Sequence, residues 1–152
     1  MTLLTGEFRN TLDEKGRISL PARLRAGLAG NSFVLTRGVD ACLWLFQESV
    51  WDTLVEGISA VGSPFDSNSR LVQRRMVAPA QEVEIDKLGR ISIPQTLRNY
   101  AQLGRDCTIL GMANYVEIWD SAAYALYLGE TEPDFLRAAE SFKSVVLGAK
   151  RP

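Results

Sequence analysis

The sequence predicts an α+β protein, mainly β, in which two tandem repeats form one pseudo-twofold β-domain with flanking helices. Three observations support this fold class. A thirteen-residue motif occurs twice, 73 residues apart. Short apolar runs separated by glycine-containing turns follow each copy, as is typical of short strands. Apolar residues at helical spacing close the first copy, and Asp120 is a good N-cap for a helix that closes the second, so each repeat is expected to hold about four strands and to end in a helix.

Length and composition match a folded protein of ordinary domain size. The chain has 152 residues, of which 46% are apolar and 23% charged, and its mean hydropathy is −0.03. No apolar run approaches the roughly 18 residues that cross a bilayer, and the first ten residues do not resemble an export signal. We expect a cytoplasmic protein without a membrane partner, whose cysteines Cys42 and Cys107 are reduced and buried.

The complete absence of histidine restricts the chemistry. It excludes Ser-His-Asp triads, Cys-His pairs and histidine zinc sites. A duplicated β-protein with one symmetric aspartate per half resembles the carboxylate dyad of aspartic proteases, but Asp13 and Asp86 lack the Thr-Gly or Ser-Gly that follows the aspartate there, and each has an arginine nearby. We therefore expect no enzyme activity, no small-molecule substrate, no metal and no cofactor.

The duplication extends over a whole structural unit. When Asp13–Arg25 is laid over Asp86–Arg98, eight of the thirteen positions are identical. The same offset, held without a gap, places Phe46 on Trp119 and Trp51 on Tyr124. One unit is too small to enclose a sufficient core, so the two copies are expected to pack on each other about a pseudo-twofold axis.

Each copy of the motif predicts a hairpin turn that leads into a short basic helix. An aspartate at the start of a turn accepts hydrogen bonds from amides two residues on, and the glycine supplies the positive φ of a short hairpin loop. Pro21 and Pro94 then end the strand and suit the first position of a helix. The residues expected to shape the turns are Asp13, Gly16, Asp86 and Gly89.

The remaining segments complete the expected organisation. Residues 67–77 predict a linker helix with Leu71, Val72 and Met76 facing inward, and residues 133–147 predict a final amphipathic helix that begins at Pro133. The expected parts are a first repeat over residues 1–60, a linker helix over 61–79, a second repeat over 80–130, and a C-terminal helix and tail over 131–152.

Charge is unevenly distributed although the net charge is only −1. Residues 9–25 hold five basic and two acidic side chains, whereas residues 40–66 hold five acidic side chains and no basic one. Residues 117–140 hold six acidic side chains and one arginine. Bulk positive charge is therefore absent, and separate positive and negative faces are expected.

The twice-repeated Asp-x-x-Gly-Arg, followed by Ile-Ser-x-Pro-x-x-Leu-Arg, closely resembles the MraZ family of AbrB-like swapped-hairpin transcription factors, and the resemblance covers nearly the whole chain. It implies two tandem AbrB-like swapped-hairpin repeats that form one pseudo-twofold β-barrel domain, and a homo-oligomeric ring of about eight to twelve subunits. It also implies binding to repeated boxes in double-stranded promoter DNA of the division and cell-wall gene cluster, mainly as a repressor of its own operon, and association with the nucleoid.

By that resemblance, DNA contacts are expected from the two turns. Arg17 and Arg90 are the first candidates, because a guanidinium suits both phosphate and guanine edges. The second candidates are Lys15, Lys87, Arg25 and Arg98. An alternative function is a ring-forming protein scaffold or an antitoxin-like module, in which the basic turns bind an acidic protein partner instead of DNA.

Overall fold

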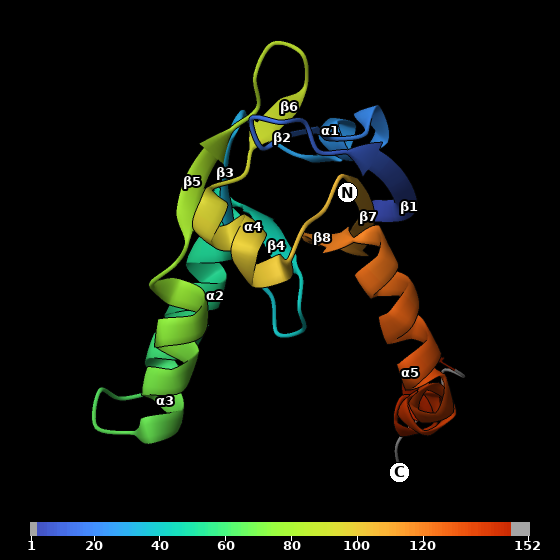
Figure 1. The fold of residues 1–152 in the computed structure, drawn as a ribbon. Coiled ribbons are helices and arrows are strands. Elements are labelled where there is room, and N and C mark those ends of the chain that lie inside the picture. The colour runs from blue at the N-terminus through green and yellow to red at the C-terminus, as the bar shows by residue number, and fades with distance from the viewer. Residues whose placement is uncertain (1–2, 147–152) are drawn as a thin grey trace. The chain divides into compact units, whose positions relative to one another are not determined.

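A computed structural model describes residues 3–146 of the chain. The chain divides into two compact units after Ser121, and each unit is described by itself. The first unit contains all the described strands of the two predicted repeats, which are labelled in Figure 1. The first repeat has the elements β1 (Leu4–Thr11), β2 (Arg17–Ser19), α1 (Ala22–Gly27), β3 (Ser32–Arg37), β4 (Leu43–Gln47) and α2 (Glu48–Val61).

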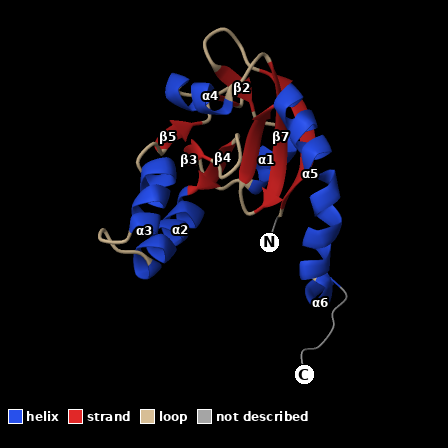
Figure 2. Ribbon diagram, turned by 60° about the horizontal axis from the view of Figure 1, so that its bottom comes forward, coloured by secondary structure: helices blue, strands red, loops and turns tan. Residues whose placement is uncertain are grey.

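The second repeat has the same order of elements. They are β5 (Gln81–Glu84), β6 (Arg90–Ser92), α4 (Gln95–Ala101), β7 (Asp106–Ala113), β8 (Val116–Asp120) and α5 (Ser121–Ser141). Between the repeats lie α3 (Ser67–Val72) and a turn of π-helix, η1 (Gln73–Val77), and α6 (Lys143–Val146) follows α5. Helices and strands are distinguished in Figure 2. The α+β class and the two-repeat organisation are confirmed.

The strands exchange partners between the repeats. Six of them form an antiparallel sheet in the order β1-β7-β8-β4-β3-β5, so β1 pairs with β7 of the other repeat and β5 pairs with β3. The two short strands β2 and β6 pair with each other as a separate ribbon. Because β1 turns into β2 and β5 turns into β6, this ribbon connects the two edges of the six-stranded sheet, whose ladder is open within the described residues.

The pairing places a pseudo-twofold axis through both sheets. In the ribbon, Ile18 lies opposite Ile91, its own counterpart in the other repeat. In the large sheet, Trp44 lies opposite its counterpart Glu117, and the Trp44 indole donates to Glu117 Oε2 at 2.8 Å. When a residue pairs with its own counterpart, the symmetry axis passes between the two. The axis therefore runs between β2 and β6 and between β4 and β8.

Matching apolar residues from both repeats form the core. The ribbon and the short helices supply three counterpart pairs, each residue at most 2% exposed. These pairs are Ile18 with Ile91, Leu20 with Ile93, and Leu24 with Leu97. In each short strand the isoleucine is buried while the arginine before it and the serine after it are less buried, so burial of one face leaves the arginines on the other.

Three sequence-based expectations need correction. Leu71 and Val72 are 57% and 39% exposed, not buried, because both line an open hollow that Val39 and Tyr100 border but do not fill. No helix begins at Pro133, which lies inside α5, since a helix already propagating keeps the backbone bonds on either side of a proline. Pro21 and Pro94 are N-cap residues, one position before the helices begin. Leu147 lies outside the described residues.

Candidate nucleic-acid interface

Two turns, the first turn (residues 13–17) and the second turn (residues 86–90), connect the edges of the large sheet to the ribbon. The first turn is closed by two backbone hydrogen bonds, Asp13 N to Arg17 O and Gly16 N to Asp13 O. Asp13 Oδ1 accepts from the amides of Lys15 and Arg17, each at 2.9 Å. This carboxylate therefore satisfies the amides that a tight turn leaves unpaired.

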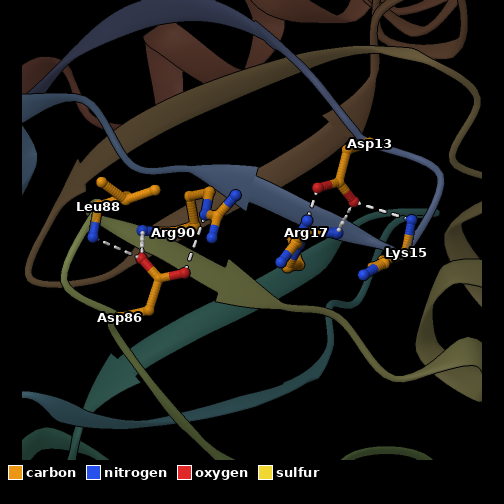
Figure 3. Close-up of polar contacts among 6 residues, drawn as sticks. All are labelled: Asp13, Lys15, Arg17, Asp86, Leu88 and Arg90. Atoms are coloured by element: carbon orange, nitrogen blue, oxygen red, sulfur yellow. Dashed lines mark hydrogen bonds and ion pairs between the residues drawn. The ribbon is translucent and has the colours of Figure 1, made fainter.

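The same carboxylate also holds the arginine side chain. Arg17 Nε donates to Asp13 Oδ2 at 2.8 Å, so one aspartate fixes both the backbone and the guanidinium of the turn. In the second turn, Asp86 accepts from the amides of Leu88 and Arg90 at 2.9 Å and from Arg90 Nε at 2.8 Å. Figure 3 shows the two turns with the same pattern of bonds, at opposite ends of the paired strands β2 and β6.

These contacts change the acidity of both aspartates. The pKa of Asp13 lies below its ordinary value, chiefly because its carboxylate accepts the Arg17 amide, and the Arg17 side chain adds to the effect. Asp86 has a lowered pKa for the same reasons, with Arg90 as the partner. Both carboxylates therefore remain ionised near neutral pH and keep the arginines in place.

The two arginines keep hydrogen-bonding capacity for a ligand. Their side chains are 31% and 26% exposed, for Arg17 and Arg90 respectively. Each is held through Nε, and within the described part of the chain neither Nη atom has a protein acceptor. A guanidinium fixed at Nε presents its two remaining nitrogens in a defined plane, which suits a phosphate or the acceptor edge of guanine.

Lys15 and Lys87 lie in these turns at positions that are not equivalent. Lys15 is exposed, and its counterpart in the second turn is Leu88, whose side chain is 72% exposed. Lys87 is exposed too, and its counterpart is Glu14. The two turns thus share one backbone and one arginine position but carry different side chains at their tips.

The structure places Arg25 and Arg98 against the turns of the opposite repeat. Arg25 Nε donates to Leu20 O at 3.0 Å, and Arg98 Nη1 donates to Ile93 O. The Arg98 guanidinium covers Gly16, and the Arg25 guanidinium covers Gly89. Sequence reasoning placed these arginines one short helix away from their own turns and missed this crossing. The glycine that both turns contain was the available signal in the sequence. A glycine has no side chain, so another side chain can pack directly against the backbone at that position.

Two hollows of the first unit lie away from the turns. One of about 490 Å³ is lined by aromatic and apolar residues that include Trp44, Phe46 and Tyr115, and one of about 590 Å³ lies along α2 and α3. Within the described residues, no group of three or more potential metal ligands gathers. None of the described helices has the length and apolar character needed to cross a membrane. Because each charged turn holds a guanidinium that keeps donors for a ligand, the turns are the strongest candidate site.

Comparisons with known proteins agree with the duplicated fold. A family model described as "MraZ protein, putative antitoxin-like" matches residues 3–75 and again residues 76–144. The Transcriptional regulator MraZ of Treponema denticola is 51% identical over 142 residues, which cover 93% of this chain and 99% of that protein. Proteins of the same name from Treponema pallidum and Natranaerobius thermophilus are 48% and 41% identical, over 94% and 91% of this chain and 96% and 95% of their own lengths. The chain therefore belongs to the MraZ family.

Proposed function

We propose that this protein is a sequence-specific transcriptional regulator that binds double-stranded promoter DNA through its two turns. The observation that carries the proposal is the pair of arginines, Arg17 and Arg90, each held at Nε by an aspartate with its other nitrogens free for a ligand. The names of the relatives, transcriptional regulators, support the same function. Lys15, Lys87, Arg25 and Arg98 are proposed as further DNA contacts.

A paired two-stranded ribbon is a shape that fits DNA. The major groove admits a β-ribbon, and arginine is the commonest reader of guanine there. The ribbon β2–β6 holds one arginine at each end, in orientations related by the pseudo-twofold axis. Side chains at the turn tips would then contact the phosphates that flank the groove.

Assembly would compensate for the low overall charge. The isoelectric point is near 5.5, so a single subunit offers few phosphate contacts. A ring of about eight to twelve identical subunits would raise the effective concentration of turns near DNA that carries matching repeats. We therefore propose binding to repeated boxes as a ring oligomer, in the cytoplasm at the nucleoid, with the acidic segments facing away from the DNA.

The regulatory target proposed for the ring is the division and cell-wall gene cluster, including the protein's own operon, with repression as the main outcome. This target rests on the family resemblance of the duplicated motif. It requires that the upstream DNA of the operon hold several regularly spaced boxes, and that a single isolated box bind poorly.

Fluorescence anisotropy on the protein's own upstream DNA and on scrambled DNA, at about 50 and 200 mM salt, tests the proposal. The wild type is expected to prefer the native DNA by about tenfold or more, and Arg17→Ala and Arg90→Ala are each expected to weaken binding by about tenfold. Circular dichroism of each variant checks that the fold is retained. Equal binding of both DNAs, or unchanged binding by both variants, would overturn the assignment of the turns.

A second candidate function is an antitoxin-like or scaffold module whose basic turns bind an acidic protein. The family description, "putative antitoxin-like", favours keeping this alternative. Competition with duplex DNA tests whether the two functions share one surface. If DNA displaces the acidic partner, both bind the same arginines of the turns. Partner binding that duplex DNA does not displace would support a separate protein-binding surface.

A further inference from the structure

The arrangement of the ribbon brings each turn close to the helix of the other repeat. Strands β2 and β6 are antiparallel, so the end of each strand lies beside the turn that begins the other. The backbone shows this directly, because Ile93 N donates to Gly16 O at 2.8 Å and Leu20 N donates to Gly89 O at 2.9 Å. The helix that follows β6 therefore starts beside the first turn, and the helix that follows β2 starts beside the second.

Each helix carries one arginine onto that neighbouring turn. A Cβ atom built on Gly16 would lie only 1.7 Å from Arg98 Nη1, so the guanidinium occupies the space next to this glycine. A Cβ atom built on Gly89 would lie 2.8 Å from Arg25 Cζ. Both glycines are buried although they lie near the tips of exposed turns, which agrees with a guanidinium covering each of them.

Each crossing arginine is held and still has donors to spare. Arg98 donates through Nη1 to Ile93 O, and Arg25 donates through Nε to Leu20 O. The carbonyl acceptors belong to the residues that directly follow the two ribbon strands. One bond of this kind orients a guanidinium without using its other nitrogens, as the aspartates do for Arg17 and Arg90.

We propose that each DNA-binding turn is completed by the opposite repeat, with Arg98 as the second phosphate-binding guanidinium of the first turn and Arg25 as that of the second. The inference rests on the proposed function, since it names further contacts of the same surface. In this arrangement Arg17 acts together with Arg98, and Arg90 acts together with Arg25. Each site therefore takes one arginine from each repeat, and neither repeat holds a complete site.

Backgrounds in which one turn is disabled test the crossing. In an Arg90→Ala background only the first turn remains, so Arg98→Ala is expected to weaken DNA binding by a further factor of about ten, while Arg25→Ala adds no further loss. In an Arg17→Ala background the pattern is expected to reverse. The readout is anisotropy on the upstream DNA, with the full-length protein.

A salt titration separates a phosphate contact from a purely structural role. In the Arg90→Ala background, Arg98→Ala is expected to make the slope of log binding constant against log salt less steep by about 1, and Arg98→Lys, which keeps the charge, is expected to retain the slope. Arg23→Ala removes an α1 arginine that donates to Thr5 Oγ1 and covers no turn glycine, so it is expected to act equally in both backgrounds.

The opposite result would overturn the crossing. If Arg25→Ala impairs the Arg90→Ala background and Arg98→Ala does not, each arginine serves its own repeat. Amide hydrogen exchange supplies a readout without DNA: Arg98→Ala is expected to speed exchange at Gly16 and not at Gly89, and Arg25→Ala the reverse. If the two variants show this pattern of exchange but the wild type binds no DNA, the proposed function is refuted and the structural crossing is kept. If each variant speeds exchange at the turn glycine of its own repeat instead, the crossing itself is refuted.

Discussion

The first and second turns share one backbone and differ in almost everything at their tips. In both, one aspartate accepts two amides and one arginine Nε with the same distances. The first turn carries two acidic and two basic side chains, whereas the second carries one acidic and two basic ones together with an exposed leucine. The motif residues therefore build the loop, and the two residues between them determine its chemistry.

The strands that lead into the turns differ as well. Arg9 precedes the first turn on β1, and its counterpart on β5 is Glu82. A second glutamate, Glu84, also lies on β5, and all three side chains are exposed. Asn10 Nδ2 donates to Ser19 O at 2.6 Å and ties β1 to β2, whereas its counterpart Val83 is buried and offers no such donor. We expect the first turn to attract DNA more strongly and the second to make fewer electrostatic contacts.

The largest effect is expected from the turn glycines. Gly16, Gly89 and Gly30 share a φ of +79°, but a Cβ atom on Gly30 would meet nothing within 4 Å. Each change to alanine is expected to lower the free energy of unfolding by about 1–2 kcal/mol, measured by urea denaturation at fixed protein concentration. Only Gly16→Ala and Gly89→Ala are expected to weaken DNA binding too, because they displace a guanidinium.

Gly30→Ala is the matched control for backbone strain. Its loss of stability without loss of DNA affinity would show that the arginines, and not the strain, explain the other two variants. An equal loss of affinity at Gly30 would contradict this account. Gly16→Ala should act more strongly than Gly89→Ala, since its Cβ atom would approach the arginine more closely.

A smaller effect is expected from exchanging the residues at the turn tips. Lys15→Leu makes the first turn resemble the second and should reduce the steepness of the salt dependence of DNA binding by about 1 in log–log slope, because one phosphate contact is lost. Leu88→Lys should increase it by a similar amount. Anisotropy over a salt series measures both slopes.

Arg74→Gln serves as the control for net charge, because it removes one charge from the exposed surface of η1. Its slope is expected to match the wild type. If Arg74→Gln lowers the slope as much as Lys15→Leu, binding follows overall charge, and the two turns need not differ in their contacts.

The smallest effect is expected from pH, and it should be equal in the two turns. Because Asp13 and Asp86 have a lowered pKa in the folded protein, their contribution to stability is present above the ordinary aspartate pKa of about 4 and is lost as the pH falls through the lowered values. With no histidine in the chain, affinity and stability should stay nearly constant between about pH 5 and 8.

Urea denaturation at several pH values, compared among the wild type, Asp13→Asn and Asp86→Asn, measures this contribution. Each variant is expected to be less stable than the wild type at pH 7, and the difference should shrink below about pH 4, where the wild-type carboxylates take up protons. A transition centred near pH 6, or a difference that grows in acid, would contradict the assignment of the lowered pKa values.

The sequence by itself determined the local structure of the turns and the duplicated order of elements. Each turn depends on signals that act over only four or five residues, so its geometry follows from local chemistry. These signals are an aspartate two residues before an exposed amide, a glycine before an arginine, and a proline ahead of a short helix. The burial of Ile18 and Ile91 follows equally from the alternation of side chains along a strand.

Only the tertiary structure decided which repeat completes which turn. The pairing of β2 with β6, and of β1 with β7, joins residues more than 70 positions apart, and no local pattern distinguishes that exchange from pairing within one repeat. Arg25 and Arg98 reach the opposite turns because an antiparallel ribbon places the end of one strand beside the start of the other. The linker side chains Leu71 and Val72 show the same limit, since an apolar face is buried only where another element covers it.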